Sequence, residues 1–135
     1  MSRRSFPYSP LRRALSECRV ALVSTAGVHL KDQEPFNTEG DYTYRIIPGD
    51  VDSAQLMVTH GHYDQSDADK DIDCVFPIDR VRELAQEGFI EGLGDKHIGA
   101  MGTAPNLKQF YEELTPAVSR EILHSQADIV LLTAG

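Results

Sequence analysis

The sequence predicts an α/β protein with a mostly parallel open sheet and flanking helices, a three-layer fold of the Rossmann or flavodoxin-like kind. Apolar runs of strand length recur along the chain, and segments with helical periodicity separate the later ones. Strands that alternate with helices are typical of parallel sheets, because each parallel connection crosses over the sheet. With 135 residues, 41% of them hydrophobic, the chain is expected to form one domain over residues 1–135.

The first predicted strand is RVALVST, residues 19–25, a continuous apolar run of the kind that is covered on both faces of a sheet. Similar runs occur in AQLMVTHG, around residues 56–58, and in the closing DIVLLTAG, residues 128–135. HIGAMGT, residues 97–103, is a weaker candidate because Gly99 interrupts it. The final strand closes the sequence, so we expect the sheet to be incomplete at the C-terminus.

One helix is predicted over FPIDRVRELAQEG, residues 76–88, where Ile78, Val81 and Ala85 share a face and Gly88 ends the pattern. Residues 31–54 lack any regular period and contain two prolines and two glycines. This segment is predicted to be a long loop, and loops of this length often serve as lids or binding loops. A purely structural insertion is an equally good interpretation.

A second helical segment covers residues 107–124, where Phe110, Leu114, Val118 and Ile122 recur every four residues. Within it, Thr115 followed by Pro116 has the pattern of a helix N-cap and first helical position. The segment is therefore predicted to form a short turn followed by a main helix.

Charge and composition narrow the classes of partner. The net charge of −8 and the pI near 5.0 argue against nucleic-acid binding, which requires clustered Lys and Arg. The arm formed by residues 1–18 is basic, and it is expected to be solvated or to dock on the protein's own acidic surface. Neither a membrane span nor a secretion signal is evident, so we expect no membrane partner and a cytoplasmic protein. Cys18 and Cys74 are interpreted as small buried hydrophobic residues.

Small and polar residues follow each predicted strand, at the edge where parallel sheets bind ligands. Both the first and the last strand end in Thr-Ala-Gly. We expect these residues to line a small crevice that binds a small molecule, and the candidate substrate-binding residues are Thr25, Gly27, His29, Gly61, Tyr63, Gly102, Thr133 and Gly135.

The stretch THGHYDQSDADKD contains the strongest chemical signal, with two imidazoles and four carboxylates within twelve residues. Such groups can transfer protons near neutral pH or bind a metal ion. The candidate catalytic residues are His60, His62 and Asp64, and the same three residues are the candidate metal ligands. They match part of the metallo-β-lactamase zinc pattern, but Gln65 stands where its last His belongs and the chain is too short for that fold. A small metal-dependent hydrolase is therefore the secondary interpretation.

Four segments together carry a resemblance that covers residues 11–135. They are ALVSTAGVHLKDQEPF, GDYTYRIIPGD, THGHYDQSDADKDIDCVFPIDRVRELAQEG and DIVLLTAG. They resemble the selenoprotein B family of glycine, sarcosine, betaine and D-proline reductases. The resemblance implies a cytoplasmic, thiol-linked oxidoreductase that cleaves the C–N bond of a small amino acid or betaine. It also implies a pyruvoyl-containing partner subunit, which activates the substrate amino group.

The same resemblance implies that the nucleophile, a selenocysteine or cysteine, follows the last strand and therefore lies after Gly135. The redox motif is then outside these 135 residues, so whether this chain is itself an enzyme stays open, and no cofactor is expected within it apart from a possible metal. Our hypothesis is that the sequence stops at an in-frame UGA codon, which encodes selenocysteine in this family. A naturally short relative or a shortened sequence is the alternative.

Two further expectations complete this interpretation. The apolar last strand leaves part of the sheet uncovered, so we expect a homo-oligomer. The resemblance also points to the loops around His29 and residues 60–64 as the crevice that faces the nucleophile, with His60 or His62 orienting or protonating the leaving amine. Asp67, Asp69 and Asp71 are expected to hold a cationic partner side chain, a substrate ammonium group or a metal. A non-catalytic binding or assembly module of the same fold is the alternative function.

Overall fold

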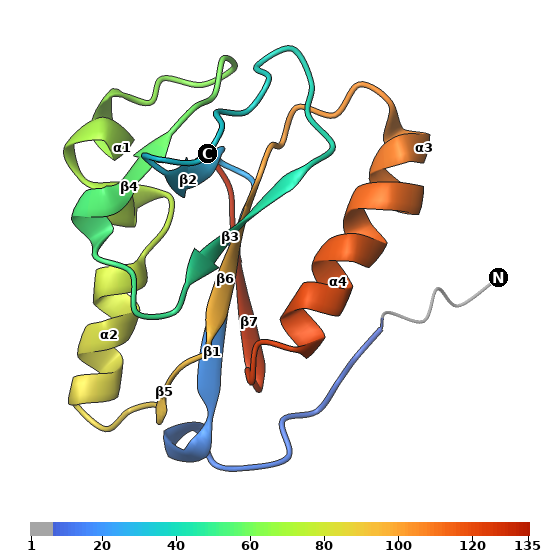
Figure 1. Ribbon diagram of the computed structural model, residues 1–135. Coiled ribbons are helices and arrows are strands. Elements are labelled where there is room, and N and C mark those ends of the chain that lie inside the picture. The colour runs from blue at the N-terminus through green and yellow to red at the C-terminus, as the bar shows by residue number, and fades with distance from the viewer. Residues whose placement is uncertain (1–6) are drawn as a thin grey trace, which may run out of the picture.

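The computed structural model describes residues 7–135 as a mixed α/β fold (Figure 1). The predicted basic arm, residues 1–18, lies partly outside this range; its described part runs exposed to the short helix η1. The elements in chain order are η1 (Leu15–Glu17), β1 (Arg19–Ser24), β2 (Val28–Leu30), β3 (Tyr44–Pro48), η2 (Ser53–Gln55), β4 (Leu56–Val58), α1 (Ser66–Lys70), η3 (Ile72–Cys74), α2 (Ile78–Gln86), β5 (Gly92–Leu93), β6 (Lys96–Ala100), α3 (Leu107–Gln109), η4 (Phe110–Leu114), α4 (Thr115–Leu123) and β7 (Ile129–Thr133).

The main sheet is built around β1, which pairs in parallel with β5, β6 and β7. Val20 pairs with both β5 and β7, and Val23 pairs with both β6 and β7. A strand has only two sides, so β5 and β6 follow one another along one side of β1 while β7 occupies the other. This arrangement confirms the predicted α/β class, the mostly parallel sheet and the strands at 19–25, 97–103 and 128–135.

β3 is a strand that the sequence analysis missed, because residues 31–54 were expected to form one long loop. It pairs antiparallel with β6, from Tyr44 opposite Ala100 to Pro48 opposite Lys96. Its closing Pro48 suits a sheet edge, where a missing backbone N–H breaks no ladder. The proline also hides this strand from a search for regular apolar alternation.

The strand predicted at residues 56–58 exists, but it is not part of the main parallel sheet. β4 pairs antiparallel with β2, with Val28 opposite Val58 and Leu30 opposite Leu56. Both strands have only three residues, and they form a separate two-stranded sheet. The apolar run at residues 56–58 predicted a strand, but such a run carries no information on which neighbour the strand pairs with.

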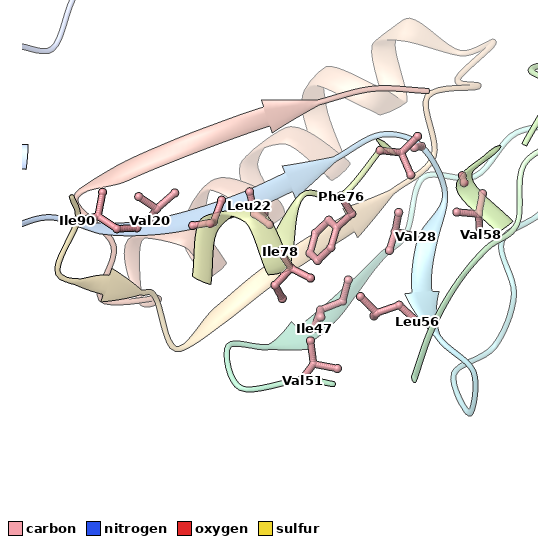
Figure 2. Close-up of a cluster of buried hydrophobic side chains, with 14 residues drawn as sticks. Val20, Leu22, Val28, Ile47, Val51, Leu56, Val58, Phe76, Ile78 and Ile90 are labelled. Carbon is pink, nitrogen blue, oxygen red and sulfur yellow. The ribbon is translucent and has the colours of Figure 1, made fainter. Parts of the chain in front are cut away.

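Helices lie on either side of the main sheet, with α1 and α2 on one side and the α3–η4–α4 segment on the other (Figure 1). The largest buried cluster lies between α2 and the sheet and extends to β2 and β4 (Figure 2). Phe76, Ile78, Leu22, Val28 and Ile47 are fully buried in it. Because burial of a large apolar side chain contributes about 1.5–3 kcal/mol, this cluster is the main stabilising element of the fold.

The segment 107–124 is one uninterrupted helical stretch, so the predicted break with an N-cap at Thr115 is wrong. Thr115 has helical dihedral angles, and its backbone N–H donates to the Phe110 carbonyl, five residues back. Pro116 has no N–H to donate and its ring crowds the preceding turn. The wider π-helical turn η4 directly before it accommodates the proline without ending the helix.

The two cysteines differ from each other in exposure. Cys18 is fully buried, as predicted, whereas Cys74 is exposed at the end of η3, so its prediction as a buried residue is wrong. The next two residues, Val75 and Phe76, are the buried members of the apolar run around Cys74. Among the helices within residues 7–135, none has the length and apolar character to cross a membrane.

His97 is a buried imidazole at the amino end of β6. Its Nδ1 accepts a hydrogen bond from the Leu22 N–H at 2.9 Å, whereas its Nε2 has no hydrogen-bond partner among the described residues. Burial, together with the nearby positive charge of Arg82, lowers the pKa of His97 to about 4, and the Gly49 carbonyl acts weakly in the opposite direction. His97 is therefore neutral in the folded protein near neutral pH.

This lowered pKa predicts that acid destabilises the fold. Below about pH 6.5 an unfolded His97 takes up a proton that the folded protein does not, so the free energy of unfolding falls with pH by up to about 1.4 kcal/mol per unit. The loss continues until the pH reaches about 4, where the folded protein also protonates His97. Denaturant unfolding between pH 7 and 5 measures it. His97→Asn should flatten the dependence while exposed His124→Asn should not; equal slopes in all three proteins would contradict the prediction.

Candidate functional site

The carboxyl ends of β1, β6 and β7 converge with the loop that follows β4, as the sequence predicted. Gly27 lies at the centre of this junction: its N–H donates to the Ala100 carbonyl at 2.9 Å, and its carbonyl accepts from the Thr59 N–H at 2.9 Å. Thr25 in turn donates its N–H to the Thr133 carbonyl at 3.0 Å. These bonds bring the Thr-Ala-Gly end of β1 beside both the end of β7 and the start of the histidine-rich loop.

Gly27 cannot be replaced by a larger residue without moving this junction. Its φ is +78°, in the left-handed region, and a Cβ built on it would lie 2.2 Å from the Thr59 carbonyl oxygen and 3.5 Å from the Cβ of His60. Gly27 therefore sets the close approach between β1 and His60.

Two hydroxyl groups join the ends of β1 and β7 to the loop between η3 and α2. Ser24 Oγ and Thr133 Oγ1 both donate to the Val75 carbonyl, at 3.0 and 2.6 Å. One carbonyl oxygen has two lone pairs and satisfies both donors. Thr133 was predicted to bind substrate; in the structure its hydroxyl is engaged here, so its contribution is to hold the end of β7 in place.

Tyr63 ties the histidine-rich loop to the end of β1. Its hydroxyl donates to the Ala26 carbonyl at 2.9 Å, and its ring lies against the ring of His60 with 4.6 Å between centroids. A Cβ on Gly135 would lie 2.4 Å from Cε1 of Tyr63, so the chain beyond β7 runs directly over the tyrosine ring. Tyr63 thus brings His60 and Gly135 to the same place.

His60 has one free ring nitrogen at this junction. Its Nδ1 accepts a hydrogen bond from the His62 backbone N–H at 3.1 Å, and an accepting Nδ1 places the proton of the neutral ring on Nε2. Partial burial, and secondarily the nearby His62, lower the pKa of His60. The side chain is half-buried, so His60 presents a neutral Nε2–H donor at the candidate site.

His62 and Gly61 both contact the neighbouring loop that carries Thr38. The His62 side chain is exposed, and its Nε2 lies 3.1 Å from the Thr38 carbonyl, to which it donates. Gly61 packs against the same residue, since a Cβ on it would lie 3.1 Å from the Cβ of Thr38. Of the two predicted catalytic histidines, His62 thus uses its Nε2 on the Thr38 carbonyl, whereas the His60 Nε2 has no hydrogen-bond partner among residues 7–135.

The loop that carries Thr38 is held by Asp41. Its carboxylate accepts from the Asn37 and Thr43 backbone N–H groups at 2.9 and 2.8 Å. Partial burial by itself would raise the pKa of Asp41, but the bonds from Thr43 and Asn37 outweigh it and lower the pKa. An ionised Asp41 therefore fixes residues 37–43, and this part of the predicted excursion is an ordered wall beside His62.

Asp64 does not join the two histidines as a metal ligand. It is exposed, and its Oδ1 accepts from the Ser66 N–H at 3.0 Å at the start of α1, which lowers the pKa of Asp64. The His60 Nδ1 is occupied by the His62 N–H. Across residues 7–135, no three His, Cys, Asp or Glu side chains gather to hold a metal ion. The predicted metal site at His60, His62 and Asp64 therefore stays a prediction, and in this arrangement the three side chains are engaged in separate hydrogen bonds.

His29 is a core residue, although it was predicted to line the crevice. It is fully buried, with Nδ1 2.7 Å from the Leu30 carbonyl and Nε2 2.8 Å from the Thr59 hydroxyl. The carbonyl can only accept, so Nδ1 carries the proton and Nε2 accepts from Thr59. Both ring nitrogens are used internally, and His29 positions Thr59 beside Gly27 rather than contacting a ligand.

The remaining predicted residue is Gly102. Gly102 is exposed and adjoins Thr25, whose carbonyl oxygen would be 3.1 Å from a Cβ on it. The residues that the structure adds include Val75, Thr38 and Ala26. These three act through backbone carbonyls, which any residue type supplies, so no side-chain pattern could have revealed them.

Comparison with known proteins gives consistent matches. Residues 3–135 match the family described as glycine/sarcosine/betaine reductase selenoprotein B. The D-proline reductase subunit gamma of Acetoanaerobium sticklandii is 47% identical over 128 residues, which cover 95% of this chain and 53% of that protein. The glycine reductase complex component B subunit gamma of Carboxydothermus hydrogenoformans is 29% identical over 133 residues, 95% of this chain and 30% of that protein.

A third relative, the sarcosine reductase complex component B subunit beta of Peptoclostridium acidaminophilum, is 28% identical over 137 aligned positions, again 95% of this chain and 30% of that protein. The chain thus spans about half of the D-proline reductase subunit and about a third of the other two. No solved structure matches the chain.

Proposed function

The chain belongs to the glycine/sarcosine/betaine reductase selenoprotein B family, and on this premise we propose that it forms one wall of a site for the reductive cleavage of a C–N bond in a small amino acid or betaine. The observation that carries the proposal is the convergence of His60, Tyr63 and Gly135 at the carboxyl ends of β1 and β7. Helix and strand ends of this kind are where open parallel sheets bind small ligands.

The groups that perform the redox chemistry are proposed to lie outside these residues. A selenocysteine or cysteine after Gly135 supplies the nucleophile, and a pyruvoyl group of a partner subunit activates the substrate amino group. The residues present fit such a nucleophile, because the chain at Gly135 runs against the Tyr63 ring and Tyr63 contacts His60. A residue placed after Gly135 would therefore enter the site near the Tyr63 ring and the His60 ring that packs against it.

His60 is the proposed hydrogen-bond donor to the leaving nitrogen. Cleavage of the C–N bond leaves its electron pair on nitrogen, and the Nε2–H of a neutral imidazole can stabilise this developing charge through a hydrogen bond while the nitrogen takes up its proton from solvent. The His62 backbone N–H fixes the required tautomer through Nδ1, and Tyr63 fixes the ring plane. These two contacts assign positioning roles to His62 and Tyr63.

The partner is proposed to dock on the acidic segment after the site. Asp67, Asp69 and Asp71 are exposed along α1 and just after it, where cationic side chains of a pyruvoyl-containing subunit can reach them. The proposal places the protein in the cytoplasm, where the thiols that reduce such a site stay reduced. The expectation of a homo-oligomer is also retained for the isolated chain, because β7 exposes Val130, Leu131 and Leu132.

D-proline is the substrate that the comparison favours, because the 47% identical relative is a D-proline reductase subunit. The test uses the reductase assembled from this protein and its native partner subunits, with a dithiol as reductant, and D-proline, glycine, sarcosine and betaine offered separately. We expect dithiol-dependent consumption of D-proline. Consumption of glycine, sarcosine or betaine instead would show that the substrate is a different one of the family's substrates. Cleavage of none of the four compounds would contradict the proposed reaction.

A further inference from the structure

β7 exposes an unpaired side to solvent, and its sequence lacks the features that usually protect an exposed strand edge. Within residues 7–135, β7 pairs with β1 alone. Natural edge strands are blunted by charges, prolines, bulges or very short length. The five residues Ile129–Thr133 contain no charged residue and no proline, and their pairing with β1 is continuous over five positions.

The register shows which backbone groups face the open side. Thr25 donates its N–H to the Thr133 carbonyl, and in a parallel ladder alternate residues bond to the same neighbour. Ile129, Leu131 and Thr133 therefore direct their backbone groups to β1. Val130 and Leu132 direct their N–H and carbonyl groups away from β1, toward the open edge.

Apolar side chains are uncovered on both faces of this edge. Val130 and Leu132 are 40% and 73% exposed on the face toward α4, and Leu131 is 40% exposed on the opposite face. On the α4 side, an apolar groove of about 490 Å³ lies between the helix and the sheet, lined by Leu114, Val118, Ile122, Val130 and Leu132 among others. A strand added to β7 would cover the edge and both faces together.

The lengths of the relatives indicate what covers it. This chain matches only 53% of the D-proline reductase subunit gamma, so nearly half of that subunit lies outside the match. The glycine and sarcosine reductase subunits have still more sequence outside it, since only 30% of each is matched. A segment with apolar side chains on both faces of a strand fits an edge that is apolar on both faces.

We propose that the open edge of β7 is an interface that pairs with a β-strand from the complementary part of a reductase subunit of this family, so that the sheet continues past β7. The added strand hydrogen-bonds to the backbone of Val130 and Leu132 and places apolar side chains in the α4 groove. The proposal rests on family membership and on the geometry of β7, not on the chemistry at His60. It therefore stands or falls separately from the proposed reaction.

The experiment produces the full chain in the same cells as the affinity-tagged complementary part of the A. sticklandii subunit, the residues outside the match. We expect the two to co-purify as a one-to-one complex, with amide hydrogen exchange at Val130 and Leu132 slowed at least about tenfold compared with the chain alone. Chain that self-associates through β7 when alone is expected to dissociate into this complex.

Two variants distinguish strand addition at β7 from non-specific hydrophobic association. Leu132→Asp places a charge in the apolar groove at an exposed position, and it should weaken complex formation at least about tenfold. Leu107→Asp changes another exposed leucine, at the start of α3, which does not line the groove, and it should leave the complex intact. Circular dichroism checks that both variants fold.

Three results would overturn the proposal. They are the absence of a complex, a complex that leaves the Val130 and Leu132 amides unprotected, and a dimer of this chain through β7 that persists when the complementary part is present. Equal weakening by Leu132→Asp and Leu107→Asp would also contradict it, because it would show that the groove is not specifically involved.

Discussion

Replacing His60 with Gln is expected to lower kcat for reductive cleavage by about 10²–10³-fold in the assembled reductase, the usual cost of removing one positioned donor to a developing charge. The Gln amide is not held by the His62 N–H or by the Tyr63 ring, so it is not fixed in place to donate to the leaving nitrogen. His60 is half-buried at the junction and its Nε2 bonds to no other residue within 7–135, so the folded structure should be retained. Steady-state rates with saturating substrate and dithiol, together with circular dichroism, measure both effects.

His62→Gln is the matched control, the same change two residues away. The His62 side chain donates to the Thr38 carbonyl, which a Gln amide can also do, and its backbone N–H continues to fix His60. We expect a change in kcat of no more than about threefold, well below the contribution of a positioned donor to the developing charge. Equal losses in the two variants, or a larger loss at His62, would contradict the role assigned to His60.

The pH dependence of the unmodified enzyme follows from the same contacts. The neutral ring of His60 is the active form, because protonating Nδ1 removes the bond from the His62 N–H. Since partial burial and then His62 lower the pKa of His60, the ring stays neutral to a lower pH than an ordinary histidine. Activity should therefore decline on the acid side only below the usual histidine range, and this acid limb should be absent in the residual activity of His60→Gln.

Replacing Gly27 with Ala is expected to give the largest loss of stability at the site, about 2–5 kcal/mol. Part of the cost, about 1–2 kcal/mol, comes from placing a side chain at φ +78°. The rest arises because the new Cβ would lie 2.2 Å from the Thr59 carbonyl oxygen, which forces β1 and β4 apart. Denaturant unfolding of the variant and the unmodified chain gives the difference.

Gly88→Ala separates the two causes. Gly88 has nearly the same backbone angle, φ +75°, but a Cβ there meets no atom within 4 Å. It should cost about 1–2 kcal/mol, the conformational part alone. If Gly27→Ala proves no more destabilising than Gly88→Ala, the close approach of β1 to the His60 loop is not the constraint that the structure indicates.

The strands of the main sheet were predictable where burial on both faces produces a continuous apolar run, as in β1 and β7. β3 escaped prediction because an edge strand needs neither a long apolar run nor regular alternation, and Pro48 is tolerated only because it lies there. The pairing of β4 with β2 could not be predicted from the residues of either strand, because it depends on which strands the chain brings together in space. Thr115 and Pro116 have the sequence of a helix start, yet a π-helical turn absorbs the proline within one helix.

The place of the candidate site was predictable because strand ends collect at one edge of a parallel sheet. The roles of individual residues were not. His29, His60 and His62 look equivalent in the sequence, but hydrogen bonds use both nitrogens of His29 and tie the His62 side chain to Thr38. The three-dimensional arrangement shows that the His60 Nε2 has no hydrogen-bond partner within residues 7–135, and that the Asp64 carboxylate bonds to the Ser66 N–H at the start of α1.

The central claim is that the fold brings a neutral His60, with its proton on Nε2, to the carboxyl ends of β1 and β7. Nitrogen-15 NMR of the histidine rings in the unmodified chain at pH 7 tests this claim directly, with His60→Gln used to assign the signals. The structure predicts a neutral His60 ring protonated at Nε2, with a nuclear Overhauser contact between that ring and Tyr63. A His60 ring protonated at Nδ1, or carrying a positive charge at pH 7, would contradict it.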